Sequence, residues 1–185
     1  IGNFDGITLF FRNTGDRNNP IFSAPSANPF GLSDVGSLAR PTFIDIDGDG
    51  DLDAFVGVGA RYTFFFQNTG TADNPSFILN DSGAPFGLGS NRNSAPLNFV
   101  DIDGDGDLDA FLGMGHYSGS GGIIFFRNIG TASNPAFYRD SLNPFGLGSM
   151  GIYLSPEFVD IDDDGDIDSF IGSEHGSMFF ENTSM

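Results

Sequence analysis

The sequence predicts an all-β protein made of tandem repeats, each with about four short strands. Three nearly identical Asp-rich segments start at Asp45, Asp101 and Asp160, which are 56 and 59 residues apart. The apolar stretches between them also repeat, and no segment shows a sustained period of 3.6 residues. The 27 Gly and 10 Pro provide many turns, and 22 Phe supply core material in a chain of 185 residues.

Four segments of the first whole repeat are expected to form strands. Residues 41–45 (PTFID) are β-biased and bounded by Pro, and residues 52–57 (LDAFVG) alternate and resume a strand after the Asp loop. Residues 63–68 (TFFFQN) are apolar on successive positions, which predicts burial of both faces between packed sheets. An Asn-Thr-Gly turn follows, and Pro75 stands at the start of the last strand, where it removes no ladder hydrogen bond.

The phase of the repeats predicts how the chain is divided. Residues 1–40 match the later part of a repeat and lack its Asp loop, and residues 41–95 and 96–155 are whole repeats. Residues 156–185 form a partial repeat that has the Asp loop. We therefore expect one continuous array that is a piece of a longer protein or a processed form, so a missing signal peptide carries little weight.

The charge is negative and concentrated. The chain has 25 acidic residues and seven Arg, for a formal net charge of −18, and 16 of the acids lie in the three nine-residue Asp segments. This surface disfavours nucleic acid and anionic membranes as partners. No apolar run approaches the roughly 20 residues of a membrane span. The absence of Cys excludes a disulfide framework and a thiolate metal site.

The Asp segments have the residue pattern of a loop that binds a hard cation. Side chains at positions 1, 3 and 5 converge on one point, Gly at position 6 permits a sharp turn, position 7 offers its carbonyl, and Asp at position 9 closes the shell. Ca²⁺, which takes six to eight oxygens, fits better than Mg²⁺, which demands a tight octahedron. Without a cation, the crowded carboxylates would repel each other and their pKa values would rise. Three bound Ca²⁺ would change the formal charge from −18 to −12.

An EF-hand is the first alternative for these loops, and the sequence argues against it. An EF-hand needs Glu at position 12 and a helix on each side. Position 12 is Val56, Leu112 or Ile171, and the flanking segments are strand-like.

The D-x-D-x-D-G-x-x-D loop between strands, followed by F-V/L/I-G, resembles the FG-GAP or VCBS repeats, and the resemblance covers essentially the whole chain. It implies blades of a β-propeller, as in the head of integrin α chains, with structural Ca²⁺ in a hairpin loop of each blade. Carried over by position, the ligands are Asp45, Asp47, Asp49, Asp53 and the carbonyl of Asp51; Asp101, Asp103, Asp105, Asp109 and the carbonyl of Asp107; and Asp160, Asp162, Asp164, Asp168 and the carbonyl of Asp166. Asp163 replaces the Gly of the other two loops, lies outside the ligand pattern and is expected to point to water.

The number of repeats leaves the architecture open. Propellers have four to eight blades, and this chain has about three and a quarter repeats. Either the rest of the ring lies outside this sequence, or two chains complete one ring, or the repeats stack into an open rod or fibre. We favour the propeller and keep the open array as its alternative.

Other candidate sites are weaker. Three equivalent Asp copies argue for a structural task and against the two unlike carboxylates of a glycosidase, so we predict no enzyme activity. His116 and His175 are interpreted as surface-turn residues, and 118–122 (SGSGG) is a hairpin tip without the Lys of a phosphate loop. The Phe-Phe pairs are interpreted as core. A lectin-like site would use the few Tyr, and two sequons could carry glycans in a suitable host; these residues are Tyr62, Tyr117, Tyr138, Tyr153, Asn80 and Asn182.

We therefore predict a secreted or cell-surface β-repeat scaffold that holds about three structural Ca²⁺ and serves adhesion or extracellular assembly. Its expected partners are Ca²⁺, other copies of itself or neighbouring repeats of a longer chain, and a glycan or surface-protein ligand. Extracellular modules are tuned to about 10⁻⁴–10⁻³ M Ca²⁺, which suits loops of modest affinity. The alternatives are a subunit of an extracellular fibre formed by end-to-end stacking, and a carbohydrate- or protein-binding propeller module.

Overall fold

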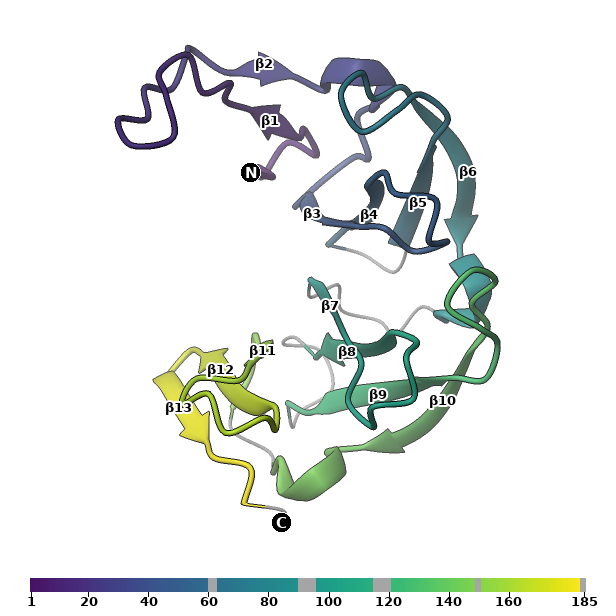
Figure 1. The fold of residues 1–185 in the computed structure, drawn as a ribbon, viewed down its shortest axis with the longest axis vertical. Helices are drawn as coiled ribbons and strands as arrows, with labels where there is room; N and C mark the ends of the chain where they lie inside the picture. The colour runs from purple at the N-terminus through teal and green to yellow at the C-terminus, as the bar shows by residue number, and fades with distance from the viewer. Residues whose placement is uncertain (60–62, 90–95, 115–120, 149–150, 184–185) are drawn as a thin grey trace.

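The computed structural model describes residues 1–59, 63–89, 96–114, 121–148 and 151–183, and this part of the chain forms 13 strands in four antiparallel sheets (Figure 1). The first sheet pairs β1 (Leu9–Phe10) with β2 (Ser26–Ala27). The second contains β3 (Arg40–Ile44), β4 (Asp53–Gly57), β5 (Thr63–Asn68) and β6 (Phe77–Gly83). The third contains β7 (Leu97–Val100), β8 (Asp109–Gly113), β9 (Ile123–Asn128) and β10 (Phe137–Leu142). The fourth contains β11 (Ser155–Val159), β12 (Asp168–Ser173) and β13 (Gly176–Phe180).

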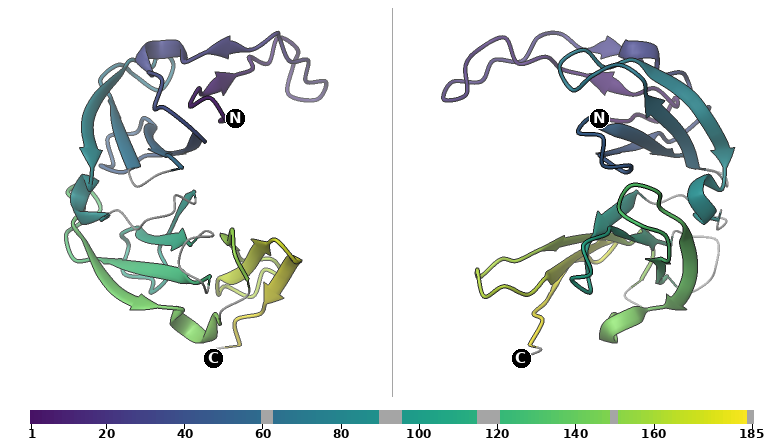
Figure 2. Two further views of the ribbon diagram at one scale, coloured as in Figure 1. Left: turned by 180° about the vertical axis from the view of Figure 1, so that it is seen from behind. Right: turned by 45° about the vertical axis from the view of Figure 1, so that its right-hand side comes forward.

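The sheets follow one another around an open arc. Within each of the three larger sheets the strand order follows the chain, so every connection is a hairpin between antiparallel neighbours. Figure 1 shows β3, β7 and β11 on the inside of the arc and β6 and β10 along its outer edge, and the two views of Figure 2 agree. The all-β prediction is confirmed. The described residues form an arc and not a closed ring.

The apolar runs of the third strands lie between sheets, as their sequence predicts. Phe65 belongs to the core shared with the third sheet, whereas its neighbours Phe64 and Phe66 face the core beneath the N-terminal segment. On β9, Ile124 and Phe126 face the second sheet, while Ile123 and Phe125 face the fourth. Successive residues of a strand point to opposite faces, so a strand that is buried on both sides must be apolar at every position.

Hydrogen bonds join the inner strands of consecutive sheets. The Thr42 hydroxyl on β3 donates to the carbonyl oxygen of Leu97 on β7 at 2.9 Å. The Asn98 side-chain amide on β7 donates to the Glu157 carboxylate on β11 at 2.7 Å. These polar contacts supplement the apolar cores and tie each sheet to the next along the inside of the arc.

The repeated Pro-Phe-Gly-Leu segments form one-turn 3₁₀ helices: η1 (Pro29–Gly31), η2 (Pro85–Gly87) and η4 (Pro144–Gly146). Of these, η1 contacts β6 and η2 contacts β10, each in the sheet that follows it. Gly87 has φ of 92°, and a Cβ there would lie 2.4 Å from the carbonyl oxygen of Phe137, the first residue of β10. Gly31 meets Phe77, the first residue of β6, in the same way at 2.3 Å. Glycine is required at these junctions because both the conformation and the close approach exclude a side chain.

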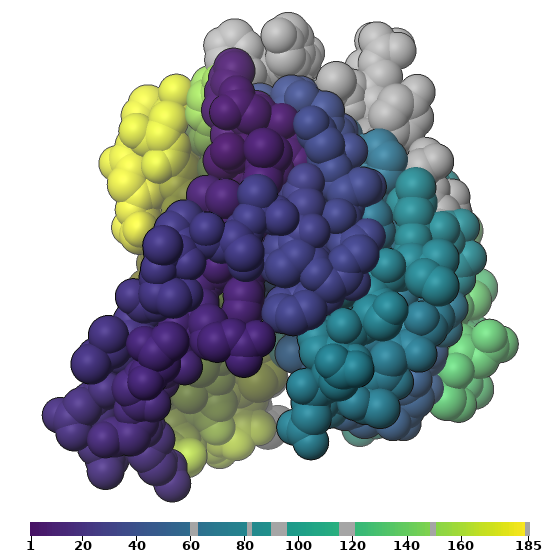
Figure 3. Space-filling view, turned by 90° about the horizontal axis from the view of Figure 1, so that it is seen from above, coloured from purple at the N-terminus to yellow at the C-terminus, as the bar shows by residue number. Residues whose placement is uncertain are grey.

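The N-terminal segment crosses one face and projects beyond the rest of the molecule (Figure 3). An apolar groove of about 640 Å³ runs between this segment and the second sheet, and Phe10, Phe22, Phe43 and Leu52 are among its lining residues. In the described residues, no helix has the length and apolarity needed to cross a membrane.

Candidate metal centres

Each Asp segment forms the loop between the first and second strands of a sheet, and backbone amides hold its first carboxylate. The Asp45 carboxylate accepts hydrogen bonds from the amides of Gly48 (2.8 Å), Asp49 (3.1 Å) and Gly50 (3.0 Å). Asp101 and Asp160 each accept the same three bonds, at 2.7–3.2 Å, from their own loops. The loop closes around its first carboxylate because Asp competes with regular structure for nearby amides.

Left-handed backbone at two positions makes this closure possible. Gly48 and Gly50 have φ of 73° and 92°, and Gly104 and Gly106 of the second loop match them. In the third loop Asp163 takes φ of 66° at the position of Gly48. Its side chain is exposed, as the sequence predicts. Asp is among the few non-glycine residues that enter this region, at some cost in strain.

Three carboxylates of each loop converge. In each of the triplets Asp45–Asp47–Asp49, Asp101–Asp103–Asp105 and Asp160–Asp162–Asp164, one oxygen from every residue lies within 4.8 Å of the others. This arrangement could hold a metal ion, as predicted for positions 1, 3 and 5.

The Asp at position 9 is buried beside each triplet. Asp53 and Asp109 are each only 2% exposed. One oxygen of each accepts a hydrogen bond from a backbone amide on the neighbouring strand, that of Asn68 or Asn128, at 2.7 Å. Asp168 is also buried and accepts the amide of Asn182 at 2.8 Å. These residues occupy their predicted places, while their roles as ligands, like those of the position 7 carbonyls, remain predictions.

Unpartnered buried oxygens collect at these loops. Among the described residues, six buried side-chain polar atoms lack a hydrogen-bond partner, and five are Asp-loop oxygens: Asp47 Oδ1, Asp51 Oδ1, Asp53 Oδ2, Asp109 Oδ2 and Asp166 Oδ1. Each unsatisfied buried oxygen costs about 1–3 kcal/mol, and more when it is charged. A hard cation would satisfy such oxygens, so the donor set fits a metal that prefers carboxylate ligands.

Without a cation, the surroundings of the Asp loops disfavour the ionised form of several of their carboxyl groups. Burial raises the pKa of Asp53 to about 6, the Asp47, Asp49 and Asp51 charges add to the effect, and the Asn68 amide opposes it. Burial likewise raises the pKa of Asp109 to about 6. Burial and neighbouring carboxylates also raise the pKa values of Asp51, Asp107, Asp162 and Asp166. A bound cation would reverse the direction of these shifts.

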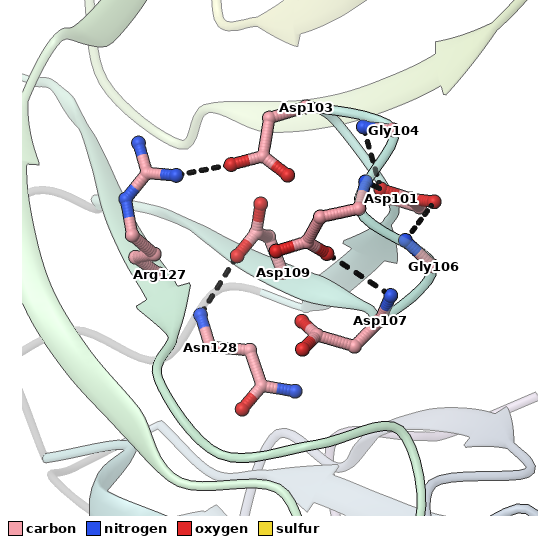
Figure 4. A network of polar contacts seen from close by, with 9 residues as sticks. Asp101, Asp103, Gly104, Gly106, Asp107, Asp109, Arg127 and Asn128 are labelled. Carbon is pink, nitrogen blue, oxygen red and sulfur yellow. Dashed lines mark hydrogen bonds and ion pairs between the residues drawn. The ribbon is translucent and has the colours of Figure 1, made fainter.

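The third strands of the second and third sheets, β5 and β9, each present a side chain to the Asp loop beside them. Figure 4 shows the Arg127 guanidinium directed at the Asp103 carboxylate, with which it forms an ion pair. In the first loop the Gln67 amide meets Asp47 at 3.5 Å. Sequence reasoning missed these contacts. Gln67 and Arg127 stand at the same position of the repeat, but they are different residue types and do not read as a repeated motif.

Sequence reasoning also assigned no structural role to the Asn that ends β5 and β9 and follows β13 two residues later. The Asn68 side-chain oxygen accepts the amides of Gly70 (3.0 Å) and Ser76 (2.8 Å), and Asn128 makes the matching pair of bonds. Its backbone amide meanwhile holds the buried Asp. The recurrence of Asn at this place in every copy was the available signal.

The remaining candidates lie apart from the Asp loops or outside the described residues. His175 is exposed and its ring lies 3.5 Å from Glu174. Tyr138 and Tyr153 are exposed, and the side-chain amide of exposed Asn80 on β6 donates to Gln67 at 3.1 Å. His116, Tyr62, Tyr117 and most of the 118–122 segment lie outside the described residues.

No protein-family model and no curated protein sequence matches this chain. The three Asp loops and their surroundings are therefore the basis for assigning a function.

Proposed function

We propose that this chain is part of a calcium-stabilised β-repeat scaffold that serves adhesion or assembly outside the cell. Its repeats resemble FG-GAP or VCBS repeats, and we propose that its three larger sheets are blades of a propeller that is open in this chain. The observation that carries the proposal is the set of buried, unpartnered Asp oxygens beside three convergent carboxylate triplets.

The position of Ile46 links the first loop to the packing of the sheets. Ile46 lies between two triplet residues, Asp45 and Asp47, yet it is 2% exposed and packs in the core between the second and third sheets. A loop held in shape by a cation would keep this side chain in that core. Folding, sheet packing and metal binding are then one linked equilibrium.

Calcium and an extracellular setting follow from the chemistry of the ligands. All the proposed side-chain ligands are carboxylates, and several on one loop suit the larger coordination shell of Ca²⁺ better than the strict octahedron of Mg²⁺. Millimolar extracellular Ca²⁺ would fill sites of modest affinity. In such a scaffold the bound cation supplies positive charge, while the Asp side chains hold the two flanking strands together.

Thermal unfolding with and without EDTA tests the calcium proposal. We expect a clear fall in Tm in EDTA and its recovery with CaCl₂ but not with equimolar MgCl₂. Asp164→Asn, which removes a triplet carboxylate, should reduce the Ca²⁺-dependent part of the Tm. Asp163→Asn removes the same charge from the exposed neighbouring side chain and should leave that part unchanged. An identical Tm in EDTA and CaCl₂ would contradict the proposal.

End-to-end assembly of repeats is the second candidate, and the exposed faces at the two ends of the arc favour it. Ile161 matches Ile46 in the third loop but is 54% exposed, and Phe179 on β13 is exposed as well. At the other end lies the apolar groove beside Phe10 and Phe22. Electron microscopy distinguishes the forms. Filaments that fray in EDTA would indicate assembly as the function, whereas separate discs would favour a ligand-binding propeller.

A further inference from the structure

We propose that the three cation sites differ in affinity and that the side chain before Asn68, Asn128 or Asn182 sets their order. These residues are Gln67, Arg127 and Glu181, and the order of decreasing affinity is the third, the first and the second site. The inference rests on the proposed cation binding and adds a set of affinity-determining residues to it.

The three residues occupy the same position. In the pairing of the second and third strands, Ala54 faces Phe66, Ala110 faces Phe126 and Ser169 faces Phe180. The residue that follows each Phe is Gln67, Arg127 or Glu181. The next residue is always Asn, whose backbone amide donates to the buried Asp of the loop at 2.7–2.8 Å. Register and hydrogen bonding thus bring each of these residues to the edge of its own cation site.

Contacts in the first two loops show what this position does. Gln67 and Arg127 both reach the position 3 carboxylate, Asp47 or Asp103, which is a triplet member. The uncharged Gln67 amide donates a long hydrogen bond to Asp47, and the Gln67 side-chain oxygen accepts a hydrogen bond from Asn80. Arg127 forms an ion pair with Asp103. Its positive charge therefore occupies the carboxylate that would otherwise attract the bound cation. A cation entering the second site must compete with the guanidinium for Asp103.

Arg127 is held in this position from its other side. Its guanidinium carbon lies 5.4 Å from the centre of the Phe125 ring, two residues back on β9. An Arg over an aromatic face gains a cation–π contact. The pairing with Asp103 is therefore a property of the folded strand. The side chain cannot simply leave the site without losing a second contact.

Formal charge gives the same order. Each loop has five Asp in the ligand pattern, and these stand beside neutral Gln67 in the first loop, Arg127 in the second and Glu181 in the third. Without the exposed Asp163, the local formal charges are thus −5, −4 and −6. A cation is attracted most strongly to the third site and least to the second. An unpartnered carboxylate oxygen remains in every loop, on the position 9 Asp53 or Asp109 in the first two and on the position 7 Asp166 in the third. In the third loop both oxygens of Asp168 accept backbone amides.

Site-resolved NMR on the metal-free full chain tests this order. The amides of Gly50, Gly106 and Gly165 each donate to the first Asp of their own loop, so each reports on one site. During titration with CaCl₂ we expect Gly165 to reach its midpoint first and Gly106 last. Arg127→Gln should lower the Gly106 midpoint about fivefold, a size consistent with a partly exposed ion pair. Gln67→Arg should raise the Gly50 midpoint by a similar factor, and Glu181→Gln should raise that of Gly165.

Arg139→Gln is the matched control. Arg139 is exposed on the neighbouring strand β10. Its replacement by Gln changes the net charge of the chain by the same amount as Arg127→Gln. It should leave all three midpoints in place. Equal midpoints in the wild type, or a Gly106 midpoint that Arg127→Gln does not lower, would overturn the inference while leaving cation binding intact. If none of the three amides shifts on addition of Ca²⁺, the proposed function itself fails.

Discussion

The first and third Asp loops have nearly the same sequence and the same internal hydrogen bonds, but they lie in different surroundings. In both, three backbone amides hold the first carboxylate, and the last Asp is buried. Ile46 of the first loop lies in the core against the third sheet, whereas Ile161 of the third loop is exposed. The comparison teaches that local chemistry shapes the loop, while its contribution to stability depends on the sheet packed against it.

The largest expected effect comes from truncating the two matched isoleucines. Ile46→Ala should destabilise the chain by about 2–5 kcal/mol, because it leaves a cavity between two sheets. Ile161→Ala should change stability by less than about 0.5 kcal/mol, because the side chain is exposed. Urea unfolding in saturating CaCl₂ measures both. Equal losses for the two variants would mean that the third loop is covered in solution.

The glycines of the Pro-Phe-Gly-Leu turns extend the comparison to the junctions between sheets. Gly87→Ala combines a left-handed backbone with a clash against the carbonyl oxygen of Phe137 and should cost about 2–4 kcal/mol. Gly146 has φ of 81° but nothing within 4 Å of an added Cβ. Gly146→Ala should therefore cost only the backbone strain, about 1 kcal/mol. The difference in urea midpoint between the two variants measures the cost of the clash at the junction. Equal midpoints would mean that the close approach of Gly87 to Phe137 contributes nothing.

The pH dependence of the metal-free chain separates charge repulsion from packing. Asp53 and Asp109 have folded-state pKa values near 6, above the usual value of an Asp. Between about pH 4 and pH 6 the folded state therefore binds more protons than the unfolded state, so stability falls as pH rises through this window. In CaCl₂ the slope should reverse, because protons compete with the cation. Urea midpoints at pH 4, 5, 6 and 7 measure this, with Asp53→Asn expected to flatten the metal-free slope.

The smallest expected effect concerns the backbone of the third loop. Asp163→Gly should stabilise the Ca²⁺-loaded chain by about 0.5 kcal/mol, because Gly adopts a φ of 66° without strain. The reverse change in the second loop, Gly104→Asp, should destabilise it by a similar amount. Thermal unfolding of the pair in CaCl₂ tests this. Destabilisation by Asp163→Gly would assign the Asp163 side chain a role that its exposure does not suggest.

Much of the local structure was predictable from the residues. The run of Phe64 to Phe66 predicted a strand buried on both faces, and the structure confirms this. The alternating Asp with Gly at position 6 predicted converging carboxylates, and the triplets do converge. Both predictions rest on periodicity and short-range turn chemistry, which act within a few residues of chain.

Contacts between distant segments were not predictable in this way. Nothing in the pattern DIDGDGDLD distinguishes Asp103, which faces Arg127, from Asp47, which faces Gln67. The two partners are 24 and 20 residues away along the chain, and only the pairing of strands brings them to the loop. The role of Asn68, which holds both the buried Asp53 and the following turn, was hidden for the same reason.

The sequence by itself determined the repeats, the strands, the turn glycines and the first three acidic ligands of each proposed site, because these depend on side-chain alternation and local hydrogen bonds. The tertiary structure alone decided which Ile is buried, which glycine meets a neighbouring carbonyl and which charge faces each Asp loop. Those properties arise when one sheet packs on the next. Nearly identical nine-residue segments therefore acquire different energies at different places in the arc.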